Sequence, residues 1–305
     1  MSIFFLCIIF LWIFFGNFLY NMIFNKKKVE QKERHLEEEK DMERRRNINR
    51  DFRLLKESKN FEDIYIKGKD SLKLHAYYLY ADSPNWVILF HDYLEDASDM
   101  ATIAGIYVEK NFNVLMVDAR GHGKSEGNIV SLGVLDSADV MQWIAYIVGR
   151  RPHAKIVLHG ISMGAHAILL NSSHFPSNIT AIISENTYTS IYDLLYYQIH
   201  QRFGILTSPL LISLSFIAKI RMGFTLKEFS VLEKLQKNRD PILFIHTKED
   251  DLVPSIMMEA LYKVCNADKQ KYLLQGEHGL AYFMDDRYSK IVNHFLDRYM
   301  NGSPL

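Results

Sequence analysis

The chain has 305 residues, 48% of them hydrophobic, so it is long enough to bury the core of one large domain. Its 36 basic and 36 acidic side chains give a formal net charge of zero, which argues against a nucleic-acid partner. Cys7 and Cys265 are the two cysteines, and Cys7 lies in an apolar N-terminal segment. An internal disulfide is therefore not expected, and the cysteine usage favours a reducing compartment.

The first 25 residues are predicted to be a single transmembrane anchor. Ile3–Phe24 contains no charged residue, and a helix of this length spans a hydrocarbon core of about 30 Å. It lacks the preceding basic residues and the following small-residue cleavage site of a secretory signal. Because Lys26–Lys28 follow it, the positive-inside rule places the rest of the chain in the cytoplasm. A buried core helix is the alternative.

Residues 26–60 are predicted to form a charged helical stalk. Blocks of both signs alternate there, as in Glu37–Lys40 and Arg44–Arg46. Opposite charges at these spacings support a solvated helix. We expect this stalk to hold the remainder of the chain away from a bilayer.

From residue 61 onward, short apolar runs alternate with helical segments such as Asp136–Ile147 and Ser255–Val264. The first two runs read as an antiparallel hairpin, and the later ones as buried strands of a parallel sheet with helices on both faces. The predicted strands are 61–67, 72–80, 86–90, 113–117, 155–159, 179–184, 241–246 and 270–274.

The pentapeptide Gly160–Gly164 follows one of these strands directly and precedes a predicted helix. A strand, Gly-x-Ser-x-Gly and a helix together place a serine, here Ser162, on a sharp turn with its hydroxyl exposed. The pentapeptide alone could equally be a small-residue turn, so the assignment depends on the rest of the chain.

A serine nucleophile needs a base, and the base needs an acid that orients it. Asp250 and Asp251 lie in the polar loop after the strand 241–246, and His278 lies in the loop after 270–274. Ligands of open α/β sheets gather at such strand ends. The three residue types thus occur in the order Ser, Asp, His, each at the end of a strand.

Four motifs occur in the order in which the α/β-hydrolase superfamily has them. They are Leu89–Tyr93, Val117–Ser125, the serine turn Gly160–Gly164, and the segment His246–Pro254 followed by Glu277–Gly279. The chain from 61 to 305 therefore resembles this superfamily, in its serine hydrolase and esterase branch. The resemblance implies a mostly parallel sheet and a helical cap insertion, here at about 186–238.

By this resemblance, Ser162 is the nucleophile, His278 the base and Asp250 the acid. Asp250 occupies the acid position of the pattern His-Gly-x-x-Asp-x-x-Val-Pro. Its neighbour Asp251 remains a competitor, and Glu185, at the end of an earlier strand, is a more distant third.

The resemblance also implies two backbone N–H donors for an oxyanion, those of Tyr93 and Met163. The chain departs from the family at Asp92, where a glycine is usual and often adopts a positive φ. Aspartate tolerates that geometry better than most residues, so we expect a reshaped oxyanion hole. Three further residues support the motifs: His91, Gly160 and Gly164.

The segment Arg120–Ser125 could be mistaken for a phosphate-binding loop. That pattern requires a glycine five residues before Gly123, where this chain has Asp118. The histidines show no close metal-ligand spacing. We therefore expect neither a cofactor nor a metal.

Together these features predict a membrane-anchored serine hydrolase that cleaves a carboxylic acyl ester or thioester. The cap insertion is apolar around Leu210–Ile217, which favours a lipid-like acyl substrate or a surface in contact with lipid. A small-substrate peptidase or amidase of the same fold, and a catalytically silent binding scaffold, are the alternatives.

Overall fold

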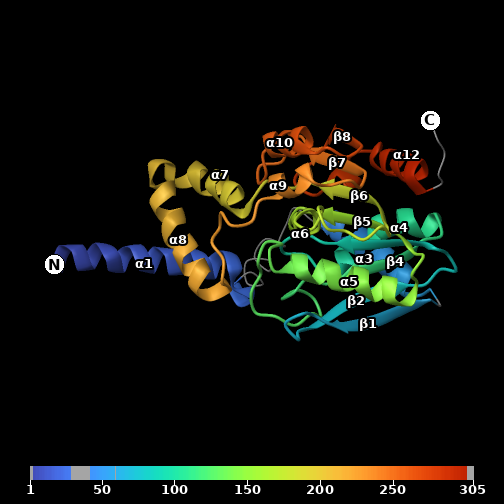
Figure 1. The fold of residues 1–305 in the computed structure, drawn as a ribbon, viewed down its shortest axis with the longest axis horizontal. Helices are drawn as coiled ribbons and strands as arrows, with labels where there is room; N and C mark the ends of the chain where they lie inside the picture. The colour runs from blue at the N-terminus through green and yellow to red at the C-terminus, as the bar shows by residue number, and fades with distance from the viewer. Residues whose placement is uncertain (1–2, 29–41, 59, 301–305) are drawn as a thin grey trace.

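Eight runs of apolar and β-branched residues pair into one sheet, which helices cover on both faces (Figure 1). The computed structural model describes residues 3–28, 42–58 and 60–300. All eight strands lie where the sequence predicts them: β1 Phe61–Lys67, β2 Lys73–Leu79, β3 Asn85–Phe90, β4 Asn113–Val117, β5 Lys155–Ile161, β6 Ile179–Glu185, β7 Ile242–Thr247 and β8 Lys269–Leu274.

The strand order is β1-β2-β4-β3-β5-β6-β7-β8. β1 pairs with β2 as an antiparallel hairpin, β2 pairs antiparallel with β4, and every other neighbouring pair is parallel. The carboxyl ends of β3 to β8 therefore meet at one edge of the sheet. This is the edge where α/β sheets place their ligands.

Successive residues of the central strands point to opposite faces, so each face has its own core. On one face Ile88, Leu158 and Ile182 pack against helices that include α5 and α6. On the other, Val87 and Val157 pack against helices that include α4 and α12. The helices and 3-10 turns outside the N-terminal and cap regions are η1 Ala97–Met100, α4 Ala101–Glu109, α5 Asp136–Arg150, α6 Met163–Leu169, α10 Ile256–Val264, α11 Ala281–Met284 and α12 Tyr288–Met300.

The segment between β6 and β7 forms the predicted helical insertion. It contains α7 Ile191–Phe203, the 3-10 turn η2 Gly204–Leu206, α8 Thr207–Met222 and α9 Val231–Gln236. α7 and α8 project from the carboxyl edge of the sheet toward α1 (Figure 1). Within the described residues, 191–222 is long and apolar enough by length and composition to cross a membrane, although a third of its 18-residue apolar window is buried.

The N-terminal segment forms α1, a helix over Ile3–Phe24. α1 lies against α8, where the Arg221 guanidinium donates to the Asn17 amide oxygen at 2.7 Å and the Trp12 indole N–H donates to the Pro209 carbonyl at 3.1 Å. Phe24, at its end, is fully buried in the core shared with α5 and α6. The apolar stretch of α1 within the described residues, Ile9–Phe24, is shorter than a full membrane span.

α3, Met42–Lys56, differs from the expected stalk because it packs on α4 and η1. Arg44 forms an ion pair with Glu95, and Asp51 accepts a hydrogen bond from the Thr102 hydroxyl at 2.9 Å. The ring of Phe52 packs edge-on against those of the β-hairpin. Because α3 is amphipathic, it can pack one face on the domain while its charged side chains form ion pairs and hydrogen bonds with the domain. Residues 29–41 of the expected stalk lie outside the described residues.

Candidate active site

Ser162 lies on a strained turn between β5 and α6. Its φ is +49°, an unusual value for a residue with a side chain, and such strain is typical of a strand–serine–helix turn. A Cβ on Gly160 would come within 2.5 Å of the Ala165 nitrogen, and one on Gly164 within 2.4 Å of the Phe90 carbonyl oxygen. Both glycines are therefore required for the close approach of the backbone at this turn.

The structure brings Ser162, His278 and Asp250 together in one line of hydrogen bonds. Nε2 of His278 lies 2.8 Å from Oγ of Ser162, and its Nδ1 lies 2.7 Å from Oδ2 of Asp250. The three come from the ends of β5, β7 and β8, which lie at the same carboxyl edge of the sheet, with β6 between β5 and β7. This is the arrangement in which an imidazole removes the proton of a serine.

Asp250 is held by its own loop, whereas Asp251 is exposed to solvent. The backbone N–H of Val253 donates to Oδ1 of Asp250 at 2.8 Å, and the Asn186 amide donates to its Oδ2 at 2.6 Å. Burial alone would raise the pKa of Asp250, but the hydrogen bonds of His246 and His278 lower it well below its usual range. The carboxylate thus stays charged opposite His278.

Asn186 is a residue of this site that sequence reasoning missed. It directly follows β6, so its place at the carboxyl edge was the available signal. Its amide also donates to the Thr247 hydroxyl at 2.7 Å, which ties the β6 end to the acid loop.

Glu185, the third candidate for the acid, is fully buried and takes no part in this line. Its carboxylate lies 2.7 Å from Nε2 of His159 and accepts a hydrogen bond from the Tyr288 hydroxyl. The Tyr107 hydroxyl bonds the other nitrogen of His159 at 2.8 Å. Glu185 therefore belongs to a separate polar cluster between the sheet and the α4 and α12 layer.

The backbone N–H groups of Tyr93 and Met163 converge on one point beside Ser162. That point is occupied by Oδ1 of Asp92, which lies 2.6 Å from the Tyr93 nitrogen and 3.4 Å from the Met163 nitrogen. The left-handed backbone anticipated at Asp92 is not found, and the positive φ falls two residues later at Leu94, with a value of +74°. An aspartate therefore replaces the usual glycine here without that strain.

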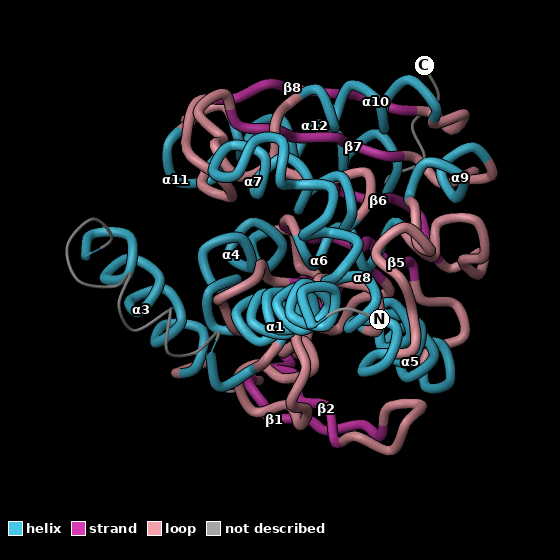
Figure 2. Tube along the Cα trace, turned by 90° about the vertical axis from the view of Figure 1, so that its left-hand side faces the viewer, coloured by secondary structure: helices cyan, strands magenta, loops and turns pink. Residues whose placement is uncertain are grey.

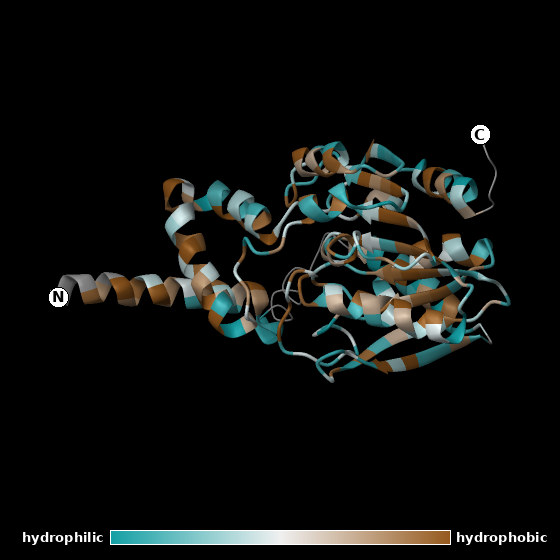
Figure 3. Ribbon diagram, in the orientation of Figure 1, coloured by the Kyte–Doolittle hydropathy of each residue, from teal (hydrophilic) through white to brown (hydrophobic). Residues whose placement is uncertain are grey.

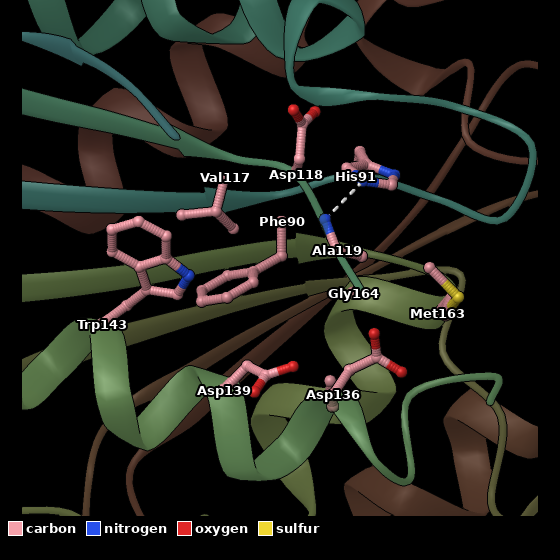
Figure 4. A pocket seen from close by; sticks show the side chains of 11 residues that line it. Phe90, His91, Val117, Asp118, Ala119, Asp136, Asp139, Trp143, Met163 and Gly164 are labelled. Atoms are coloured by element: carbon pink, nitrogen blue, oxygen red, sulfur yellow. Dashed lines mark hydrogen bonds between the residues drawn. The ribbon is translucent and has the colours of Figure 1, made fainter. Parts of the chain in front are cut away.

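His91 supports the loop that carries Asp92. Its Nε2 accepts a hydrogen bond from the Ala119 N–H at 3.0 Å, drawn as a dashed line in Figure 4, and its Nδ1 lies 2.7 Å from the Asp92 carbonyl oxygen. A small pocket behind the turn is lined by His91, Met163 and Asp136 among others (Figure 4). Neither Ser162 nor His278 lines that pocket, so it lies behind the reacting groups.

His278 lies between two carboxylates. Its Nε2 is 3.2 Å from Oδ2 of Asp92, on the side away from Asp250. Burial lowers the pKa of His278, but the charges and hydrogen bonds of Asp92 and Asp250 outweigh it and raise the pKa to about 10. The imidazole is therefore positively charged at neutral pH in this conformation.

The loop that contains Arg120–Ser125 does not leave its amides free for a phosphate. Asp118 accepts a hydrogen bond from the Lys124 N–H at 2.8 Å, so a carboxylate already fills this turn. Arg120 is bonded to Asp139 and Asp70. Among the described residues, no group of three or more His, Cys, Asp or Glu side chains could hold a metal ion.

The end of α1 lies directly against the candidate site. The Tyr93 hydroxyl donates a hydrogen bond to the Ile23 carbonyl at 2.9 Å, and the Phe24 carbonyl accepts one from the Val130 N–H at 2.9 Å. Figure 2 looks along α1, which is seen end-on and which contacts α8. The N-terminal helix thus contacts the same loop that supplies the Tyr93 N–H.

The doubly covered sheet, the strained serine turn and the cap insertion define an α/β hydrolase. The family profile of the serine aminopeptidases, S33, matches residues 82–239, which is more than half of the chain. The chain belongs to this family of α/β hydrolases.

Individual relatives and solved structures resemble the chain over most of its length. YqkD of Bacillus subtilis is 30% identical over 226 residues, which cover 73% of this chain and 74% of YqkD. The membrane protein YNL320W of Saccharomyces cerevisiae is 25% identical over 77% of this chain and 79% of its own length. The esterase Pf2001 of Pyrococcus furiosus shares the fold, with a TM-score of 0.64 and 21% identity over 79% of this chain and 93% of the esterase.

Proposed function

We propose that this protein is a membrane-anchored serine hydrolase that cleaves a carboxylic acyl ester or thioester through an acyl-enzyme. The observation that carries the proposal is the unbroken line from Oγ of Ser162 through His278 to Asp250, at 2.8 Å and 2.7 Å. The family membership and the esterase-like fold of Pf2001 support an esterase-type reaction.

In the proposed reaction, His278 takes the proton of Ser162 while its Oγ attacks the carbonyl carbon of the substrate. Asp250 holds the imidazole with Nε2 toward the serine and stabilises the imidazolium. The Tyr93 and Met163 N–H groups bind the oxyanion. His278 then protonates the leaving alcohol or thiol, and a water activated by the same imidazole releases the acid.

Labelling by a fluorophosphonate probe tests this proposal. The full-length protein in detergent should be labelled and should hydrolyse p-nitrophenyl esters, from acetate to palmitate, with a chain-length optimum. Ser162→Ala should lose both properties and keep its fold. A folded wild-type protein that neither reacts with the probe nor turns over any ester would point to the scaffold alternative.

A peptidase or amidase is the second candidate, because the family to which the chain belongs is described as serine aminopeptidases. Esters and amides pass through the same acyl-enzyme, but an amide requires protonation of a poorer leaving group. Matched aminoacyl p-nitrophenyl esters and p-nitroanilides, assayed on one sample, separate the candidates. Anilide turnover that equals or exceeds ester turnover would favour the peptidase.

Membrane attachment through α1 is supported by the apolar side chains that this helix exposes. α8 exposes further apolar side chains beside it, and both helices carry brown, hydrophobic segments in Figure 3. The exposed apolar residues of this surface are Leu6, Ile9, Phe10, Leu11, Ile13, Phe14, Phe15 and Phe18 on α1, and Phe203, Ile205, Leu206, Ile212, Phe216 and Ile220 on the cap. We call it the apolar end.

We propose that the apolar end lies in the bilayer and that the hydrolase domain faces the cytoplasm. Lys26–Lys28 follow α1 directly, and basic residues next to a membrane segment favour the cytoplasmic side. The apolar end lies beside the candidate site, and this position favours a lipid-like acyl substrate. Protease protection of the full-length protein in sealed vesicles, with a tag at each end, tests this orientation.

A further inference from the structure

Asp92 places a carboxylate where the proposed reaction needs an empty site. Its Oδ1 accepts from the Tyr93 N–H at 2.6 Å and from the Met163 N–H at 3.4 Å, the two donors that converge beside Ser162. An oxyanion of the substrate would need the same two donors at about the same point. The side chain of the protein itself therefore competes with the reacting oxygen for these N–H groups.

The second oxygen of this carboxylate contacts the candidate base. Oδ2 of Asp92 lies 3.2 Å from Nε2 of His278, the nitrogen that lies 2.8 Å from Ser162 Oγ. Asp92 thus contacts both the N–H groups that would bind the oxyanion and the imidazole that would accept the serine proton.

The backbone of Asp92 is fixed on both sides. Its N–H donates to the Glu95 carboxylate at 3.3 Å, and its carbonyl oxygen lies 2.7 Å from Nδ1 of His91. Glu95 is itself paired with Arg44 of α3. The Asp92 carboxylate can therefore leave the oxyanion hole only by rotation of its side chain, because the backbone of the loop is held in place.

The carboxylate is charged at neutral pH. Burial raises the pKa of Asp92, but its interactions with His278 and the Tyr93 N–H outweigh this and leave the pKa below its usual value. Hydrogen bonds to an ionised acceptor are stronger than those to a neutral one. A neutral substrate carbonyl is therefore the weaker competitor for these donors until negative charge develops on it.

We propose that the Asp92 carboxylate is an internal occupant of the oxyanion hole that holds this hydrolase in a resting state. An acyl substrate must displace it before Ser162 can attack. The inference rests on the proposed function, since it concerns the same serine. It predicts that the resting protein reacts slowly with acylating and phosphonylating reagents, and that the Asp92 side chain alone causes the low rate.

Two variants of the full-length protein in detergent test the inference. Asp92→Ala empties the hole, and Asp92→Asn keeps its shape without the charge. Neither meets a positive φ, so neither adds backbone strain. We expect the second-order rate of fluorophosphonate labelling to rise about tenfold or more in Asp92→Ala, and to a smaller extent in Asp92→Asn. Asp286→Asn, which removes an exposed carboxylate from the turn between α11 and α12, is the matched control.

The outcomes separate the two proposals. Equal or slower labelling of both Asp92 variants, with thermal unfolding like that of the wild type, would overturn the resting-state inference and leave the serine hydrolase intact. If Asp92→Ala does not fold, faster labelling of Asp92→Asn still supports the inference, and unchanged labelling overturns it. If the folded wild type and both variants all fail to react, the hydrolase proposal falls and the inference with it.

Discussion

At the scale of single residues, the candidate site consists of one serine and one histidine between two carboxylates. Asp250 is bonded to Nδ1 of His278 and Asp92 contacts Nε2, so the imidazole is held from both sides. In the proposed reaction only one of these contacts assists a serine attack. The carboxylate on Nδ1 would orient the base, whereas the one on Nε2 would compete with Ser162 for it.

The assignment of the acid can be tested by comparing two neighbouring carboxylates. Asp250→Asn should lower kcat by about 10⁴-fold, because the imidazole loses its orienting partner. Asp251→Asn should change kcat less than about twofold, since this side chain is exposed. Steady-state turnover of one ester by both variants decides the assignment, and the reverse ranking would move the acid by one residue.

The pH dependence of kcat/KM should report the pKa of His278, which the carboxylates of Asp92 and Asp250 raise. The base acts only when neutral, so activity should rise with pH through its pKa, which lies at about 10 in the resting conformation. Removing the charge at residue 92 lowers this pKa. We therefore expect the acidic limb of Asp92→Asn to lie about one pH unit or more below that of the wild type. Coincident profiles would show that Asp92 does not face the base in solution.

At the scale of elements, α1 has two parts with different surroundings. With 22 residues it is about 33 Å long, although its apolar stretch within the described residues, Ile9–Phe24, is shorter. Its last turns, however, are buried among the cap and the main domain, with Tyr20 and Phe24 in the core. The length that lipid could cover is correspondingly shorter, and α8 adds apolar surface beside it.

Two phenylalanines of α1 offer a matched comparison. Phe24 is 0% exposed and Phe10 is 68% exposed. Phe24→Ala should lower the free energy of unfolding by about 3–5 kcal/mol, because it leaves a cavity in the core. Phe10→Ala should leave it within about 0.5 kcal/mol. Denaturant unfolding in detergent measures both, and equal effects would mean that the end of α1 is not part of the domain. Removal of residues 1–25 would likewise expose core residues to solvent, because it deletes the buried side chains of Tyr20 and Phe24.

At the scale of the whole molecule, the apolar end and the carboxyl edge of the sheet lie on the same side (Figure 1). The end of α1 contacts the loop of Asp92 and Tyr93 through a hydrogen bond from the Tyr93 hydroxyl to the Ile23 carbonyl. If the apolar end lies in the bilayer, as proposed, the carboxyl edge that carries Ser162 faces the same side. α3, which packs on α4 and η1, braces the same loop through Arg44 and Glu95.

Flotation with liposomes tests the contribution of the cap to membrane binding. Ile205 is 93% exposed and lies next to the exposed Leu206. Ile205→Ser together with Leu206→Ser should weaken membrane partitioning by about tenfold or more, because two apolar side chains leave the lipid. Ile256→Ser, at a position 69% exposed on α10, is the control and should float like the wild type. Equal flotation of all three would exclude the cap from the membrane contact.

The strands, the serine turn and the order of Ser162, Asp250 and His278 could be predicted from the sequence, because they depend on local periodicity and on motifs within a few residues. The sequence also located the substitution at Asp92, but not where that carboxylate points. The fold shows that Asp250, and not its exposed neighbour Asp251, bonds His278. It also packs α3, part of the expected stalk, against the domain and buries the end of the expected anchor. These outcomes depend on contacts between segments far apart in the chain, and no local pattern encodes such contacts.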